Sequence, residues 1–106
     1  MNSGFPSPAQ YYRAKGLDLN TYLIHHPEST FFLRVRSSCY ESLQVFQGDL
    51  LIIDRNCYPR RNDLVLAIID GQRRLIRYIP PGSSQNTAPV EIWGTITYVV
   101  HTVRAP

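Results

Sequence analysis

The stretch from residue 47 to residue 78 constrains the fold more than any other part of this 106-residue chain. It contains two short runs rich in Ile, Leu and Val, at 50–53 and 64–69, each bounded by Asp or Gly. Apolar runs of this length between turn-forming residues predict buried β-strands rather than helices. Asp70 and Gly71 separate the second run from a third that carries arginines, as expected of a strand with one wet face. This pair predicts a two-residue hairpin, because both turn positions must tolerate positive φ.

Alternating residues predict further strands on either side. Between Thr30 and Arg36 the expected buried face holds Phe31, Leu33 and Val35, and the expected wet, basic face holds Phe32, Arg34 and Arg36. After a turn-rich loop at 80–87, residues 90–103 return to strand. Strict alternation there places Ile92, Gly94, Ile96, Tyr98 and Val100 on one face, and Trp93, Thr95, Thr97, Val99 and His101 on the other.

The chain before these strands divides into an arm and a short helix. Residues 1–17 are predicted to form an extended N-terminal arm, because Pro6 and Pro8 lie two positions apart, and residues 18–106 form the β-domain. Asp18 or Asn20 can cap the helix. The helix carries Leu19, Tyr22, Leu23 and Ile24 and ends at His25-His26-Pro27.

The composition is that of a globular domain. Hydrophobic residues make up 43% of the chain, and no apolar run approaches the roughly 20 residues that a membrane-spanning helix needs. The chain opens without a secretory signal, so we expect a cytoplasmic protein in which Cys39 and Cys57 are free thiols; one disulfide is the alternative. Three histidines make a poor zinc site, and no cofactor is expected. The net charge of +3 favours acidic partners only weakly.

Several segments occur in one order along the chain: Gly4-Phe5-Pro6-Ser7-Pro8-Ala9, Asp18-Leu19-Asn20, His26-Pro27, Gly48 to Asp54, Asp63 to Gly71, and Trp93-Gly94-Thr95. Together they resemble the LexA/UmuD-type family of self-cleaving serine–lysine proteases, and within it the UmuD branch in its processed UmuD′ form. The resemblance implies a mainly β fold, a small domain of the β-clip type with mostly antiparallel strands and one short N-terminal helix. It also implies a homodimer. The implied partners are a UmuC-like Y-family DNA polymerase and, indirectly, the RecA filament on single-stranded DNA.

The catalytic pair of that family is altered in this chain. The family uses a serine nucleophile and a lysine that is neutral because it is desolvated. The resemblance places Cys39 at the serine and Ile76 at the lysine. Isoleucine cannot accept a proton, and Arg77 is expected on the opposite face of the strand and stays protonated. The only lysine, Lys15, is near the arm, so we expect a pseudo-protease with no functional catalytic residues.

Two further departures accompany this change. The chain begins just before the Phe5-Pro6-Ser7-Pro8 segment, where self-cleavage in the family removes an arm, so we interpret it as already processed. Between Tyr78 and Trp93 the chain is shorter than the family pattern, and the P-x-N-x-x-Y hairpin segment is absent or reduced.

These features predict a non-catalytic accessory subunit of an error-prone, polymerase V type DNA polymerase, active in SOS mutagenesis and translesion synthesis. Partner contacts are expected from the arm and the basic strand face, at Phe5, Pro6, Pro8, Tyr11, Tyr12, Arg34 and Arg36, although the arm aromatics could equally pack on their own domain. Two alternatives are a residual self-cleaving peptidase that uses Cys39 and a regulator that forms mixed dimers with an intact UmuD-type protein. A third is single-strand nucleic-acid binding through Arg34, Arg36, Arg73, Arg74 and Arg77 with Phe32 and Tyr78.

Overall fold

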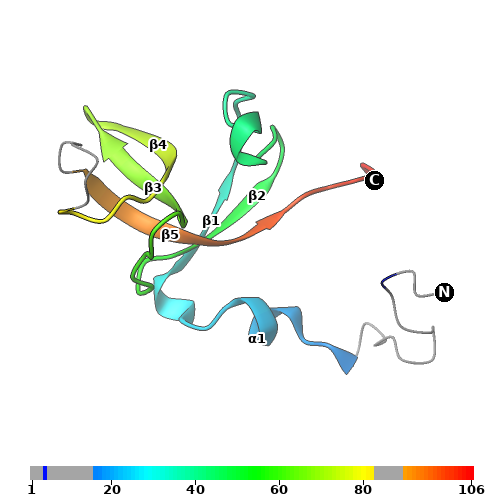
Figure 1. Ribbon diagram of the computed structural model, residues 1–106. Helices are drawn as coiled ribbons and strands as arrows, with labels where there is room; N and C mark the ends of the chain where they lie inside the picture. Colours follow the sequence, from blue (N-terminus) through cyan, green and yellow to red (C-terminus); the bar gives the residue numbers. More distant parts are fainter. Residues whose placement is uncertain (1–3, 5–15, 83–89) are drawn as a thin grey trace.

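The computed structural model describes residues 4, 16–82 and 90–106. In these residues five strands form one antiparallel sheet in the order β1-β2-β5-β3-β4 (Figure 1). The elements are α1 (Leu19–Leu23), the 3₁₀ turns η3 (Pro27–Ser29) and η4 (Glu41–Leu43), and the strands β1 (Thr30–Arg34), β2 (Leu50–Asp54), β3 (Leu64–Ile69), β4 (Gln72–Arg77) and β5 (Glu91–Val100). The expected mainly β fold with one short helix is confirmed. The arm residues other than Gly4 and Gly16–Leu17 lie outside the described part.

The tight hairpin between β3 and β4 forms as predicted. Ile69 pairs with Gln72, and the two residues between them, Asp70 and Gly71, have φ angles of 52° and 78°. Positive φ at both positions is typical of the two-residue hairpin turn whose backbone twist matches the right-handed twist of the two strands that it joins. The local chemistry of Asp and Gly therefore sets this register.

Strand β5 lies between the two halves of the sheet, because it pairs with β2 along one edge and with β3 along the other (Figure 1). It carries two bulges. Ile52 pairs with Tyr98 and Ile53 with Ile96, which leaves Thr97 as an extra residue. A second shift, between Leu66 and Ala67, leaves Trp93 extra in the same way. Each extra residue reverses the alternation of the faces that follow.

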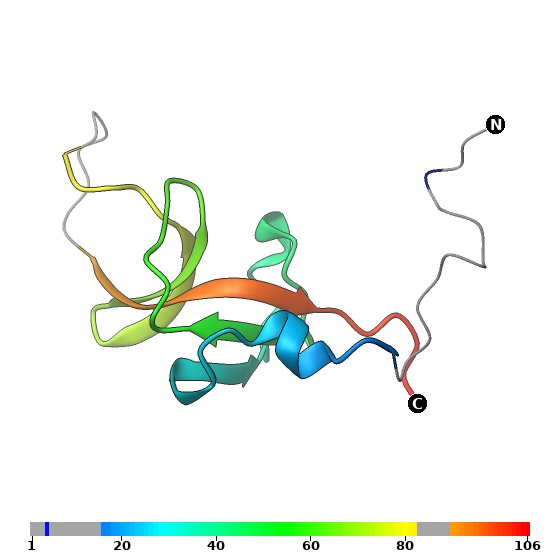
Figure 2. The ribbon, with the colours of Figure 1, turned by 90° about the horizontal axis from the view of Figure 1, so that it is seen from below.

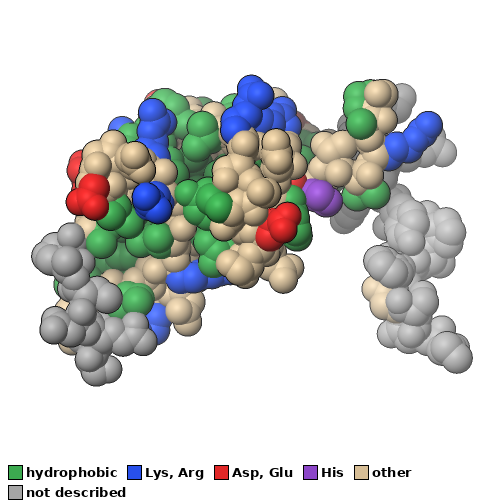
Figure 3. All heavy atoms as spheres, turned by 90° about the horizontal axis from the view of Figure 1, so that it is seen from above, with side chains coloured by type: hydrophobic (Ala, Val, Ile, Leu, Met, Phe, Trp, Pro, Cys, Tyr) green, Lys and Arg blue, Asp and Glu red, His purple; other side chains and the backbone are tan. Residues whose placement is uncertain are grey.

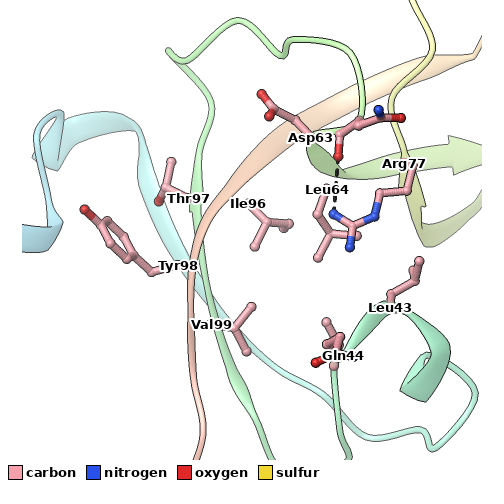
Figure 4. Close-up of a pocket in the computed structure, with 11 residues that line it drawn as sticks. Leu43, Gln44, Asp63, Leu64, Arg77, Ile96, Thr97, Tyr98 and Val99 are labelled. Atoms are coloured by element: carbon pink, nitrogen blue, oxygen red, sulfur yellow. Dashed lines mark hydrogen bonds between the residues drawn. The ribbon is translucent and has the colours of Figure 1, made fainter. Parts of the chain in front are cut away.

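The predicted strict alternation of 90–103 is therefore wrong. Ile96 and Tyr98, which were expected on one face, point to opposite sides of the sheet (Figure 4). Trp93 and Ile96, which were expected on opposite faces, both pack against the core. The strand is also shorter than predicted, because β5 ends at Val100.

The core explains why β2 and β3 are apolar without interruption. One face of the sheet carries a cluster of buried side chains: Val35, Val45, Leu51, Ile53, Leu64, Leu66 and Leu75. The opposite face buries Ile52, Val65, Ala67 and Thr95, each at 3% exposure or less. Strands covered on both faces lose the alternation of a half-wet sheet. Each fully buried Leu, Ile or Val contributes about 1.5–3 kcal/mol relative to an exposed one.

Strand β1 has the predicted wet face but a less complete buried face. Phe32, Arg34 and Arg36 are exposed as expected, while Val35 is buried and Leu33 half-buried. Phe31 was expected inside, yet 44% of its surface is exposed. Its ring packs edge-on against Trp93 with centroids 5.3 Å apart, so it covers the margin of the core rather than its centre.

Helix α1 begins at the predicted cap. The Asp18 carboxylate accepts hydrogen bonds from the Asn20 and Thr21 N–H groups and from the Thr21 hydroxyl, and the hydroxyl bond is the main reason that its pKa lies below 3.8. The helix lies beside the C-terminal half of β5, where the Tyr22 and Tyr98 rings are 6.4 Å apart (Figure 2). Among the described residues, no helix has the length and hydropathy needed to cross a membrane.

Candidate functional site

Cys39 occupies an exposed turn between β1 and η4. The Ser37 hydroxyl lies 3.0 Å from its Sγ and donates to it, while the Cys39 N–H donates back to Ser37 Oγ across 3.1 Å. In the described part of the chain, Ser37 is the only side chain with a recorded polar contact to this thiol. Among the described residues, no hydrogen bond joins this thiol to a histidine.

Ile76 is the second-last residue of β4, half-buried, where it pairs with Val65. Its neighbour Leu75 points to the other face and belongs to the core cluster against which Tyr40 packs. An aliphatic side chain therefore stands where the family resemblance places the lysine. Lys15, the only lysine in the sequence, lies outside the described residues.

A groove of about 370 Å³ opens on the Leu75 side of β4 (Figure 4). One wall is the end of η4, with Leu43, Gln44 and Val45, and the other is the start of β3 with Arg77. Residues 96–99 of β5 form the floor. Ile96 and Val99 point into this space while Tyr98 points away from it. Arg77 lies on this side and Ile76 is not among the lining residues, which agrees with the expected opposite faces of these two side chains.

Both rims of the groove contain a non-glycine residue in the left-handed region. Gln44 has a φ of 65° and Asn62 a φ of 71°. Their N–H groups donate to Glu41 O and Tyr78 O, and the Asn62 carbonyl accepts from Arg77 Nη1 at 3.3 Å. Conformations of this kind cost about 1–3 kcal/mol each and are often found where a chain binds ligand.

Of the residues predicted for partner contacts, only the two arginines lie in the described part of the chain. Phe5, Pro6, Pro8, Tyr11 and Tyr12 lie outside the described residues. Arg34 and Arg36 are exposed on and just after β1, and Arg34 Nη1 donates to the Gly48 carbonyl across 2.9 Å.

The arginines considered for nucleic-acid binding do not lie together. Arg34 is on β1 and Arg73, Arg74 and Arg77 are on β4, the two edge strands at opposite ends of the sheet order. On the face drawn in Figure 3 the Lys and Arg side chains likewise fall in separate groups rather than one stripe. A single basic track for a nucleic-acid strand is therefore not formed by the described arginines.

Two histidine–aspartate pairs were not foreseen from the sequence, and they lie at the two ends of β2. His101 Nδ1 is 2.6 Å from Asp49 Oδ1, and His26 Nδ1 is 2.6 Å from Asp54 Oδ2. Burial raises the pKa of each carboxyl, but hydrogen bonds outweigh it and hold each pKa below 3.8. The bonds to Asp49 come from the Phe46 N–H and His101, and those to Asp54 from His26, the Asn56 N–H and Ser29. In the sequence, the one sign of these pairs is that an aspartate, Asp49 or Asp54, stands at each end of the apolar run 50–53.

The two cysteines differ in environment, and neither forms a disulfide. Burial, followed by the nearby Asp54 and Asp63 carboxylates, raises the pKa of the half-buried Cys57 thiol. Within residues 16–82 and 90–106, no three His, Cys, Asp or Glu side chains form a group that could hold a metal ion.

The fold defines a class of protein, a small antiparallel β-domain with one short helix before the first strand and a tight hairpin between β3 and β4. The model of the Peptidase S24-like family matches residues 1–86, and the chain belongs to that family. This membership confirms the resemblance stated from the sequence.

Relatives that match nearly the whole of this chain support the assignment. Protein ImpA of Salmonella typhimurium is 38% identical over 96% of this chain and 79% of its own length. Protein MucA of Escherichia coli is 34% identical, with 92% of this chain and 77% of MucA covered. Protein SamA of Salmonella typhimurium is 33% identical, with 97% and 81% covered.

Proposed function

We propose that this chain is a non-catalytic accessory subunit of an error-prone Y-family DNA polymerase of the polymerase V type, acting in SOS mutagenesis and translesion synthesis. The family membership and the likeness to ImpA, MucA and SamA support a UmuD-like protein. The proposed partners, a polymerase and RecA-coated single-stranded DNA, are inferred from the resemblance to the UmuD branch.

The proposal that the subunit is non-catalytic rests on one observation: isoleucine, at position 76, stands where the resemblance places the lysine. A serine–lysine or cysteine–lysine pair needs a neutral amine to remove the proton of the nucleophile. Ile76 has no proton acceptor, and the guanidinium of the adjacent Arg77 faces the other side of β4, where it donates to Asn62 O. Among the described residues, the one side chain that contacts the Cys39 sulfur is Ser37, whose hydroxyl donates its hydrogen to the sulfur and is not a base.

A homodimer is part of the same proposal. Phe46, Val100 and Val103 leave apolar surface exposed around the end of β5, at 39%, 43% and 93%. We call these three residues the C-terminal patch. Phe46 contacts His101 with ring centroids 5.6 Å apart, so Phe46 and the end of β5 are neighbours. Exposed apolar side chains grouped at one end of a sheet suit contact with a second copy.

The deciding experiment is lesion bypass in vitro. A purified UmuC-type polymerase copies a template with one lesion in the presence of RecA-coated single strands, with and without this chain. We expect the chain to stimulate bypass and Cys39→Ala to stimulate it equally. Absence of stimulation together with absence of co-purification with the polymerase would contradict the accessory role.

The same proteins separate the two alternatives. If the parent chain stimulates bypass and Cys39→Ala does not, the thiol is used and the non-catalytic assignment is wrong. If the parent suppresses bypass by an intact UmuD-type protein and forms mixed dimers with it, the chain is a regulator.

A further inference from the structure

A stretch of β5 has one edge without a strand partner. The pairing between β3 and β5 ends with Val65 opposite Thr95. Beyond that point residues 96–100 pair with β2 alone in the part of the chain that the structure describes. A central strand whose other edge is open presents backbone N–H and C=O groups to an incoming extended segment.

The open edge is not flat surface, because it borders the groove of about 370 Å³. Figure 4 shows the slot between the η4 end and the start of β3, with Ile96 and Val99 on its floor. Leu43 and Leu64 add apolar side chains from the two walls. An extended peptide rises about 3.4 Å per residue and places alternate side chains on one side, so a four- or five-residue segment could pair with the edge and put apolar side chains into the slot.

The charge at the groove is the third observation. The Arg77 guanidinium lies at the wall, and its one recorded partner is the Asn62 carbonyl at 3.3 Å. No described carboxylate lies within ion-pair distance of it. Asp63 also lines the groove, but one of its oxygens accepts from the Arg60 N–H at 2.8 Å and the carboxylate points away from Arg77 (Figure 4). A guanidinium without a carboxylate partner beside an apolar groove favours a carboxylate ligand, since its forked donors match the two carboxylate oxygens.

From these three features we propose that the groove is a docking site for an extended, acidic segment of a partner protein. The segment adds as a strand to the open edge of β5, sets apolar side chains between Leu43 and Leu64, and places one carboxylate on Arg77. The arm of this chain is a poorer occupant, because residues 1–15 contain no Asp or Glu and carry Arg13 and Lys15. This proposal does not depend on the polymerase assignment.

The test uses two fluorescein-labelled pools of pentapeptides. Both have Val, Leu or Ile at alternate positions separated by Thr; one pool carries Asp at the first or last position and the other carries Asn there. Anisotropy with the full chain measures affinity, and amide and guanidinium NMR shifts locate the contact. We expect the Asp pool to bind about tenfold more tightly than the Asn pool. The shifts should fall on residues 96–99 and on Arg77 Nε.

Matched variants make the result specific. Arg77→Gln should remove the preference for Asp, whereas Arg73→Gln, an exposed arginine on the same face of the same strand but outside the groove, should leave it unchanged. Arg77→Lys, which keeps the charge without the fork, should retain part of the preference. Thermal melts check that the variants fold.

Four results would overturn the proposal. The first is equal affinity for the two pools, and the second is a contact mapped to Arg73 and Arg74. The third is a set of NOEs between residues 1–15 and residues 96–99 in the free protein, which would make the arm the occupant. The fourth is a set of intermolecular NOEs from residues 96–99 to a second copy of the chain without peptide, which would make a second copy the occupant.

Discussion

The imidazole of His101 lies 2.6 Å from the carboxylate of Asp49, a residue with 1% of its surface exposed at the entry to β2. The other oxygen of Asp49 accepts from the Phe46 N–H at 2.9 Å, so the contact joins the end of β5 to the loop that leads into β2. Because an ionised carboxylate only accepts, His101 Nδ1 is the donor. A buried charge of this kind is tolerated only while its hydrogen bonds are kept.

Removing this imidazole should destabilise the domain. We expect His101→Ala to lower the free energy of unfolding by about 1–3 kcal/mol, because Asp49 loses a partner but stays buried. Chemical denaturation followed by tryptophan fluorescence measures the difference. His25→Ala is the control, since His25 is exposed and no contact is recorded for it. Equal stability of His101→Ala and the parent would show that the pair contributes nothing.

Stability should fall in acid because of Asp49 and Asp54. Both carboxyls have a pKa below the ordinary 3.8 in the folded chain, so the unfolded chain binds protons first as the pH is lowered. Their contribution is complete above about pH 5 and is lost as the pH falls through 3.8 to the folded pKa values. Denaturant midpoints across the acid range should drop less steeply for Asp54→Asn than for the parent. A parallel pH profile for the two proteins would contradict the role of Asp54.

The two thiols should react at different rates. Cys39 is exposed, whereas Cys57 is half-buried and its thiol pKa is raised by burial and by Asp54 and Asp63. The thiolate is the form that attacks a thiol-specific reagent, so we expect a fast phase that Cys39→Ser removes and a slow phase that Cys57→Ser removes. The release of chromophore from a disulfide reagent at neutral pH gives both rates. A single kinetic phase, in which both thiols react at the same rate, would contradict this difference in environment.

Gly94 should resist substitution because of a neighbour rather than its backbone angle. A Cβ at this position would lie 2.5 Å from Ile53 Cγ2 and 3.4 Å from Arg55 Cγ. Ile53 is buried and Arg55 lies over Trp93 at 4.3 Å, so neither moves freely. We expect Gly94→Ala to cost about 1–3 kcal/mol through overpacking. Gly16→Ala is the control, since a Cβ there meets nothing within 4 Å, and a similar loss in both variants would refute the steric reason.

Local chemistry was enough to predict parts of this domain. The turn at Asp70 and Gly71 follows from the positive φ that these two residue types tolerate, and the start of α1 follows from the Asp18 side chain. Both depend on neighbours a few positions apart, as does the length of the apolar runs that became β2 and β3. The family could be inferred for a similar reason, because its segments follow one another in order along the chain.

The features that join distant parts of the chain were decided by the tertiary structure. The bulges at Trp93 and Thr97 arise where β5 must pair with both β2 and β3, and no alternation pattern in 90–103 announces them. Asp49 and His101 meet across 52 positions. The groove beside Arg77 exists because β3 begins too late to cover the end of β5. Sequence by itself determined the strands, the turn and the family, since those depend on local preference. Tertiary packing alone decided which face of β5 each side chain occupies, which histidine meets which aspartate, and which edge of β5 stays open. These features bring together residues that are far apart in the sequence, and their spacing does not predict the contact.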